Sequence, residues 1–204
     1  MGTSMAQAQP SAAGDEAAIA DLTNDALVIR LHYTINHLSR WLTPIHDQTR
    51  LQRTVRRGEP SVKELVLRLR DEENRVFPLL HAIANRATPD LDKLPPPVRT
   101  PDEVRRDGGD STVRIMAEFR RLRHSTCSLL RGMPDVGWDR MGVSRRGRNR
   151  TLRDLAEHLV THDWEVLAEM DRALDRVGAR EGIAAASRVH LPELLRLAPT
   201  DRRP

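Results

Sequence analysis

Hydrophobic positions recur along this chain with a helical period. Apolar residues appear at steps of three and four in four long stretches, residues 24–42, 62–87, 111–133 and 151–177. This spacing places the apolar side chains on one face of an α-helix and the polar ones on the other. No stretch alternates in the manner of a β-strand, and there is no internal repeat. The pattern therefore predicts an all-α protein built as a four-helix bundle.

The stretch 151–177 has the most regular pattern. Thr151 is a suitable N-cap, and Asp154 three residues later supplies the acidic partner of a capping-box start. Its inward stripe consists of Leu152, Leu155, Leu159, His162, Val166, Met170 and Leu174. His158 and His162 lie one helical turn apart on or beside this stripe. Such a pair is either a hydrogen-bonded feature of the core or half of a metal site.

The segments between the long helices define the expected domain organisation. Residues 88–110 form a long connection with five prolines and two glycines, expected to cross an end of the bundle. Residues 45–57 are expected to form a second, short helical piece. Residues 1–20 have no apolar period and predict a disordered leader. The bundle then spans residues 21–178, and residues 179–204 form a tail whose apolar stretch 190–197 is expected to dock as a helical fragment.

Composition limits the cellular setting. Hydrophobic residues make up 39% of the chain and charged residues 30%, but no run of 18 apolar residues exists, so no membrane span is expected. The N-terminal residues lack the basic and apolar regions of a secretory signal. A single cysteine, Cys127, fits a reducing compartment. The sequence therefore predicts a cytoplasmic protein.

The charge pattern does not favour nucleic acid as a partner. The formal net charge is +4 and the pI about 10.1, because all but two of the 33 basic residues are arginine. These charges are interspersed with acidic residues, as on solvated helix faces. Aromatic residues make up only 3% of the chain, which leaves little surface for base stacking. The loop from Arg145 to Arg150 is the one basic run, either a solvated loop or a site for a phosphate or an acidic partner.

Several short motifs follow one another along the chain. They are Ser61-Val62-Lys63-Glu64-Leu65, Asp71-x-Glu73, Pro89-Asp90-Leu91, Phe119-Arg120-Arg121-Leu122-Arg123, Trp138-Asp139-Arg140, Gly147-x-x-x-Thr151-Leu152 and His162-Asp163. In their order and spacing they resemble the DinB-like (DinB/YfiT) family of small bacterial four-helix-bundle proteins. The resemblance implies an up-down-down-up bundle with a long crossover between its second and third helices, often assembled as a homodimer. It also implies a divalent metal held by three histidines, one on the second helix and an H-x-x-x-H pair on the fourth.

Carried over to this chain, that metal centre is largely missing. The second-helix histidine falls on Arg68, and the second histidine of the pair falls on Val166, so only His162 remains. An arginine is cationic at any protein pH and cannot coordinate a metal. No metal is therefore expected at the usual site.

Two hypotheses for the function follow. In the first, the bundle cavity binds a small-molecule ligand or a low-molecular-weight thiol, with Arg68 and His162 as the catalytic residues. Arg68 would stabilise a thiolate or carboxylate, and His162 would accept a proton. In the second, His158, His162 and Glu72 form a site shifted by one turn that holds zinc, nickel or iron. That arrangement would make the protein a metal-dependent hydrolase or thiol S-transferase. A structural alternative has Arg68 paired with Glu72 or Glu73, and His162 hydrogen-bonded in the core.

Overall fold

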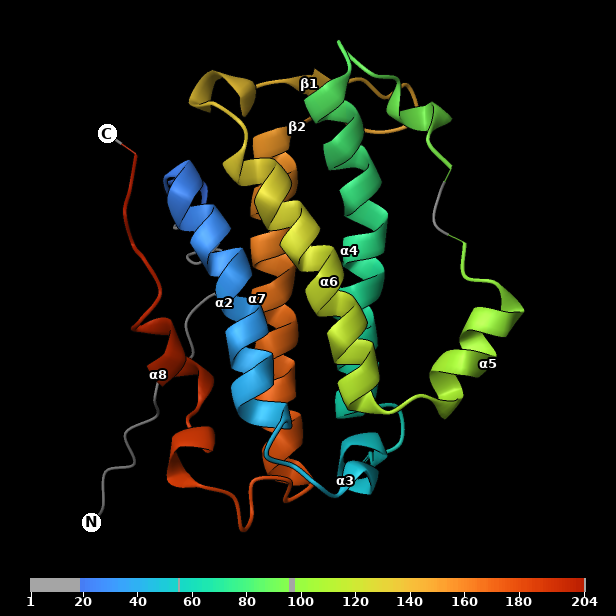
Figure 1. Ribbon diagram of the computed structural model, residues 1–204, viewed down its shortest axis with the longest axis vertical. Helices are drawn as coiled ribbons and strands as arrows, with labels where there is room; N and C mark the ends of the chain where they lie inside the picture. The colour runs from blue at the N-terminus through green and yellow to red at the C-terminus, as the bar shows by residue number, and fades with distance from the viewer. Residues whose placement is uncertain (1–18, 55, 96–97, 204) are drawn as a thin grey trace, which may run out of the picture.

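The computed structural model describes residues 19–54, 56–95 and 98–203, and it confirms the all-α four-helix bundle. The four long helices are α2 (Asn24–Leu42), α4 (Val62–Asn85), α6 (Thr112–Arg131) and α7 (Leu152–Arg176). Figure 1 shows that α2 and α7 run in one direction and that α4 and α6 run in the other. Helix α4 packs against α6 and α7, and α2 packs against the same two helices. The topology is therefore up-down-down-up, with the crossover between α4 and α6.

The helix starts agree with their sequence signals. Ser61 and Glu64 form a complete capping box at the start of α4, in which each side chain bonds the other residue's backbone N–H. Thr151 and Asp154 do the same at the start of α7. These reciprocal bonds satisfy amide groups that have no partner within the helix. The two helices that carry the candidate site residues therefore begin where the sequence predicts.

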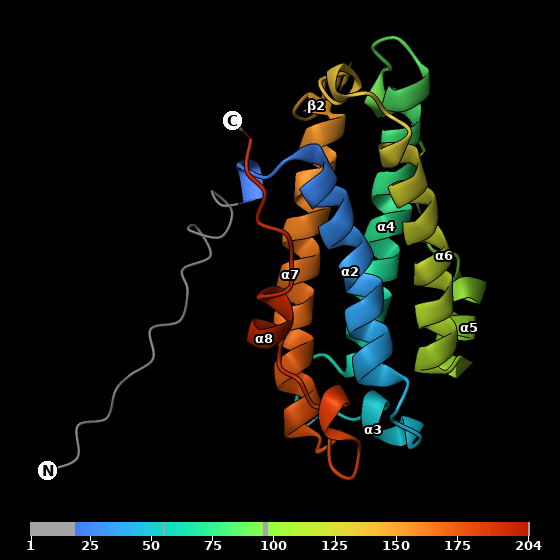
Figure 2. The ribbon, with the colours of Figure 1, turned by 60° about the vertical axis from the view of Figure 1, so that its left-hand side comes forward.

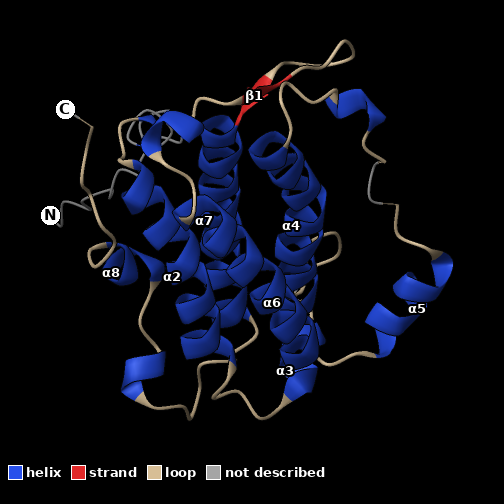
Figure 3. Cartoon of the chain, turned by 45° about the horizontal axis from the view of Figure 1, so that its top comes forward, coloured by secondary structure: helices blue, strands red, loops and turns tan. Residues whose placement is uncertain are grey.

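Several connecting elements differ from the sequence prediction. The crossover contains the helix α5 (Pro101–Gly109), and the expected piece 45–57 forms only the short helix α3 (Gln48–Gln52). Two short strands, β1 (Met141–Gly142) and β2 (Arg150–Thr151), pair antiparallel, although no strand was expected. Figure 3 shows them across the end of the bundle where α4 ends and α7 begins. The remaining elements are the 3-10 turns η1 (Leu91–Lys93), η2 (Asp135–Gly137) and η3 (Ala185–Ser187), and the helix α8 (Leu191–Leu195).

The C-terminal tail packs on the bundle. Helix α8, predicted from the apolar stretch 190–197, lies against α7 (Figure 2). The indole of Trp41 donates a hydrogen bond to the carbonyl of Val189 at 2.8 Å. Leu22 and Arg202 form a β-bridge near the two ends of the described chain. The expected leader falls mostly on residues 1–18, outside the described residues, and its last two residues are helical.

A polar layer divides the bundle interior into two apolar clusters. One cluster contains Leu38, Leu69, Phe119 and Met170, and the other contains Leu27, Leu80, Leu130, Leu155 and Leu159. All of these side chains are fully buried or nearly so. Between them along each helix lie buried polar residues: Thr34 on α2, Glu73 on α4, Arg123 and Thr126 on α6, and Asp163 on α7. Among the described helices, none is both long and apolar enough to cross a membrane.

Candidate functional site

The polar layer is organised around Arg123, which is completely buried. Its Nε donates to Glu73 Oε2 at 2.7 Å, and one terminal nitrogen donates to Asp163 Oδ1 at 2.9 Å. The other terminal nitrogen bonds Asp163 Oδ2 and, at 3.1 Å, the carbonyl of Leu31. Thr34 donates to Asp163 at 2.7 Å, and Thr126 donates to Glu73. The layer therefore links all four helices.

Arg123 remains charged in this layer. Burial alone would lower the pKa of its guanidinium, but the carboxylates of Asp163 and Glu73 raise it above its ordinary value. All three nitrogens of the group have a partner, so little hydrogen-bonding capacity is left for a ligand. Buried charges are tolerated when they are paired and hydrogen-bonded in this way. The layer is therefore a structural element that fixes the register of the helices.

A second polar cluster lies on the outer α4/α7 surface. Some of its residues are the sequence neighbours of residues in the polar layer. Glu72 precedes Glu73, and its carboxylate contacts the Nε2 atom of His158. Arg75 donates to Glu72 Oε2 at 2.8 Å and also lies 3.0 Å from His158 Nε2. Burial would raise the pKa of Glu72, but hydrogen bonds from His158 and Arg75 lower it to about 2. Glu72 is therefore an ionised carboxylate held between an imidazole and a guanidinium.

The structure gives Arg68 a different partner from the one expected. Its guanidinium donates to Glu169 on α7 at 2.7 Å, whereas Glu72 pairs with Arg75 and Glu73 pairs with Arg123. The side chain of Arg68 is 47% exposed and that of Glu169 is 34% exposed. Arg68 therefore lies on the outer surface of the α4/α7 pair and reaches across to α7.

His162 has no hydrogen bond from its ring within the described part of the chain, and its Nδ1 atom is buried without a partner. Its ring centroid is 6.4 Å from that of His158, with an angle of 30° between the planes. Burial lowers the pKa of His162, as do the neighbouring His158 and Arg68, and these effects outweigh Asp163 and Glu72. His162 is therefore a neutral imidazole with free bonding capacity, and the expected hydrogen-bonded core histidine is wrong for this ring.

The donor set of this cluster does not fit a metal ion as it is arranged. At the usual site, Arg68 is a cation and Val166 is a fully buried hydrocarbon. At the shifted site, Glu72, His158 and His162 are neighbours, but the Arg75 guanidinium already contacts both Glu72 and His158. Across the described ranges, no three histidine, cysteine, aspartate or glutamate side chains are grouped to hold a metal. A cation in the shifted site would have to displace Arg75.

Backbone N–H groups in the basic loop from Arg145 to Arg150 bond a carboxylate of the chain itself. The carboxylate of Asp92 accepts hydrogen bonds from Ser144 Oγ and from the backbone N–H of Arg145, both at 2.7 Å. It also accepts one from the N–H of Arg146 at 3.2 Å. At the start of α7, Asp154 accepts from the N–H of Thr151. Carboxylates of the chain itself therefore occupy these backbone N–H groups, which a phosphate at the start of α7 would otherwise use.

Comparison with solved structures identifies a protein with this arrangement. The fold is that of YfiT. YfiT from Bacillus subtilis is a probable metal-dependent hydrolase with an unusual four-helix bundle topology. The structural match has a TM-score of 0.61 and covers 85% of this chain and 95% of YfiT, at 16% sequence identity. At this identity the likeness to YfiT establishes the fold and leaves the activity open. No protein-family model and no curated protein sequence matches the chain.

Two arginines that build these clusters are not predicted from the sequence. Arg123 lies at an inward position of the third helix, four residues after the buried Phe119, and a charge within an apolar stripe is a readable signal. Arg75 follows Glu72 by three residues, a spacing at which helical side chains meet. That Arg75 also contacts His158 depends on the packing of α4 against α7, which the sequence does not specify.

Proposed function

We propose that this YfiT-like bundle protein binds a small anionic molecule or a low-molecular-weight thiol at the α4/α7 surface, without the three-histidine metal centre. The observation that carries the proposal is the state of His162. Its imidazole is neutral, its ring has no hydrogen bond within the described residues, and Arg68 is close enough to lower its pKa. A neutral imidazole beside a guanidinium suits a ligand that loses a proton as it binds.

The chemistry of the proposed site follows from these two groups. The thiol proton of the ligand passes to a ring nitrogen of His162, which acts as the base. The resulting thiolate lies next to Arg68, whose positive charge favours the ionised form. Because Arg68 and Glu169 are both partly exposed, an incoming anion replaces Glu169 as the partner of Arg68 at little energetic cost. A small carboxylate binds in the same way, without the proton transfer.

A second candidate is a metal-dependent hydrolase or thiol S-transferase that uses Glu72, His158 and His162. It is favoured by the contact between Glu72 and His158 and by the unpartnered nitrogen of His162 on the adjacent turn. YfiT, which has this fold, is a probable metal-dependent hydrolase. This candidate requires Arg75 to leave the site.

Titration calorimetry with N-acetylcysteine tests the first candidate, with N-acetylalanine as the matched ligand that lacks a thiol. Removal of the cation in Arg68→Gln should weaken N-acetylcysteine binding about tenfold, the equivalent of one charge-assisted hydrogen bond. Arg114→Gln is the control, because Arg114 is also an exposed arginine in an ion pair, with Asp110, and lies on α6. Equal binding of the thiol by the parent protein and Arg68→Gln would refute the proposal.

Elemental analysis of the purified protein, before and after dialysis against zinc, nickel and iron, separates the two candidates. Stoichiometric metal that is lost in both His158→Ala and His162→Ala would establish the second candidate. The first candidate predicts that Arg75→Gln gains no metal, whereas the second predicts that this variant binds metal more tightly than the parent because the competing guanidinium is gone.

A further inference from the structure

A cavity of about 310 Å³ lies between α4, α5 and α6, away from the α4/α7 surface. Its volume is at the lower end of the range that holds small-molecule ligands. Arg70, Asp71 and Asn74 line the α4 wall, while Arg121, Leu122 and Ser125 line the α6 wall. Arg99, Glu103 and Arg106 of the crossover complete the lining. Most of these residues are polar or charged, which suits a hydrophilic ligand.

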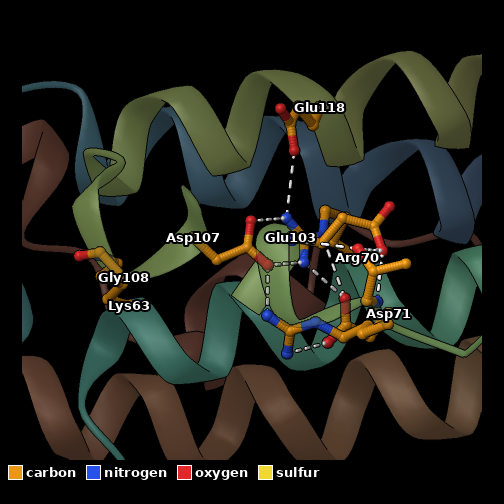
Figure 4. Close-up of polar contacts among 9 residues, drawn as sticks. Lys63, Arg70, Asp71, Glu103, Asp107, Gly108 and Glu118 are labelled. Carbon is orange, nitrogen blue, oxygen red and sulfur yellow. Dashed lines mark hydrogen bonds and ion pairs between the residues drawn. The ribbon is translucent and has the colours of Figure 1, made fainter. Parts of the chain in front are cut away.

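Arg70 ties helix α5 to α4 through Asp107, as Figure 4 shows. The side chain of Arg70 is nearly buried, and its two terminal nitrogens donate to the two carboxylate oxygens of Asp107 at 2.7 and 2.6 Å. It also bonds Asp71 at 2.8 and 3.1 Å and Glu118 at 3.2 Å. Lys63 fixes the end of α5 by donating to the carbonyl of Gly108 at 2.8 Å. These bonds use all the donors of Arg70, so Arg70 positions α5 and has none left for a ligand.

The carboxylates of the cavity are all engaged. Asp71 bonds Arg70 and Arg99, and Glu118 bonds Arg70. Glu103 accepts from the backbone N–H and hydroxyl of Thr100 at 2.8 and 3.0 Å, where it completes the capping box of α5. No acidic group of the lining is therefore left to attract a cation.

Two of the four arginines that line the cavity, unlike its carboxylates, have no side-chain hydrogen bond or ion pair in the described part of the chain. Arg106 on α5 and Arg121 on α6 form no side-chain ion pair within the described ranges, and both are exposed. Asn74 and Ser125 add an amide and a hydroxyl on the facing walls. Two exposed guanidinium groups that are in no ion pair within the described residues, one on each of two helices that line a polar cavity, attract an anion and can each form a bidentate pair with it.

The geometry points to this cavity as a binding site for a small organic anion, a phosphate or dicarboxylate compound held between Arg106 and Arg121. Asn74 and Ser125 orient the polar part of the ligand, and Leu122 contacts its carbon skeleton. This site does not depend on the proposed function of the α4/α7 surface, from which it is separated by the body of α4.

Titration calorimetry with pyrophosphate and with succinate tests this site in the full chain. The double variant Arg106→Gln/Arg121→Gln should lose at least about tenfold in affinity for the anion that binds, because two charge-assisted contacts are removed. The matched control is Arg105→Gln/Arg120→Gln, which removes the same charge from the adjacent positions of the same two helices. The control should bind within about twofold of the parent, a difference of RT ln 2.

Amide NMR shifts locate the bound anion. Addition of the anion should shift the signals of Asn74 and Ser125 in the parent protein and in the control, and should leave them unchanged in the Arg106→Gln/Arg121→Gln variant. Pyrophosphate binding without succinate binding would assign the site to phosphate compounds, and the reverse would assign it to dicarboxylates. Equal losses in the two double variants would mean non-specific attraction by net charge. That result, or an absence of binding by both anions at millimolar concentration, would overturn the proposal.

Discussion

The inner layer and the outer α4/α7 cluster are built from neighbouring residues but have opposite properties. Glu73 and Asp163 point inward to Arg123, and Glu72 and His162 face the surface between α4 and α7. In the inner layer every charged group has several partners and none is accessible. In the outer cluster the ion pairs are partly exposed and the His162 ring has no hydrogen bond within the described residues.

This difference separates residues that hold the bundle together from residues that are available for a ligand. A buried, fully paired group loses much of its stabilisation when one partner is removed, since the remaining charge is left without water. A partly exposed ion pair contributes little, because water replaces its partner. The inner layer is therefore expected to dominate stability, and the outer cluster to dominate binding. Substitutions in each cluster test this division.

The largest effect is expected from Arg123→Met, which leaves Glu73 and Asp163 buried without their cation. The free energy of unfolding should fall by about 3–5 kcal/mol, the usual cost of breaking a buried ion pair from one side. Urea unfolding followed by circular dichroism measures this change. Arg120→Met, an exposed arginine on the same helix, should change the free energy of unfolding by less than about 0.5 kcal/mol.

A triple variant distinguishes the loss of pairing from the loss of packing. Arg123→Met combined with Glu73→Leu and Asp163→Leu removes all three charges and fills the layer with hydrocarbon. It should recover most of the stability that Arg123→Met loses, because the desolvated carboxylates are gone. Equal instability of the triple and the single variant would show that the layer is important for its shape and not for its charges.

A smaller effect, with a defined pH window, is expected at Glu72. The pKa of this carboxyl is lowered in the folded protein from 4.5 to about 2. The contribution of Glu72 to stability is therefore fully present above pH 4.5 and is lost as the pH falls from 4.5 towards 2. Because Arg75 and His158 are partly exposed, we expect this contribution to be about 1 kcal/mol.

Urea unfolding at a series of pH values across that window measures the contribution of Glu72. Glu72→Gln should lose less stability than the parent as the pH is lowered, since glutamine does not titrate. Glu165→Gln, a change at an exposed carboxylate on α7, should keep the steep acid dependence of the parent. Parallel curves for the parent and Glu72→Gln would mean that Glu72 is not held by His158 and Arg75 in solution.

The fold can be predicted from the sequence more fully than the site, for physical reasons. The long helices and their capping boxes are local features, since the 3.6-residue period and the Ser61–Glu64 spacing can be read directly. Helix α5 was missed because its only large hydrophobic residue, Val104, is exposed, so it has no apolar stripe. It is fixed instead by the long-range pair between Arg70 and Asp107. Its capping box at Thr100 was the readable signal.

The site was only partly predictable for a related reason. The topology implied by the family resemblance placed Glu72, His158 and His162 near one another, and the structure brings Glu72 and His158 into contact. The apolar stripes of four helices together decide which of two adjacent residues faces inward. From the sequence alone, Glu72 and Glu73 therefore cannot be told apart. The contact of Arg75 with both Glu72 and His158 depends on the interhelical geometry of side chains. These contacts decide whether a metal ion or the guanidinium of Arg75 lies beside Glu72 and His158.

The smallest stability effect is expected from Arg68→Gln. Arg68 and Glu169 form a single partly exposed ion pair, so its removal should change the free energy of unfolding by less than about 1 kcal/mol, as measured by urea unfolding. The same variant is expected to bind the thiol about tenfold more weakly. Arg68→Gln should therefore affect binding more than stability, whereas Arg123→Met should affect stability more than binding. A loss of several kcal/mol in Arg68→Gln would mean that the α4/α7 surface holds the bundle together. In that case Arg68 would be structural, and the division between an inner layer for stability and an outer cluster for binding would fail.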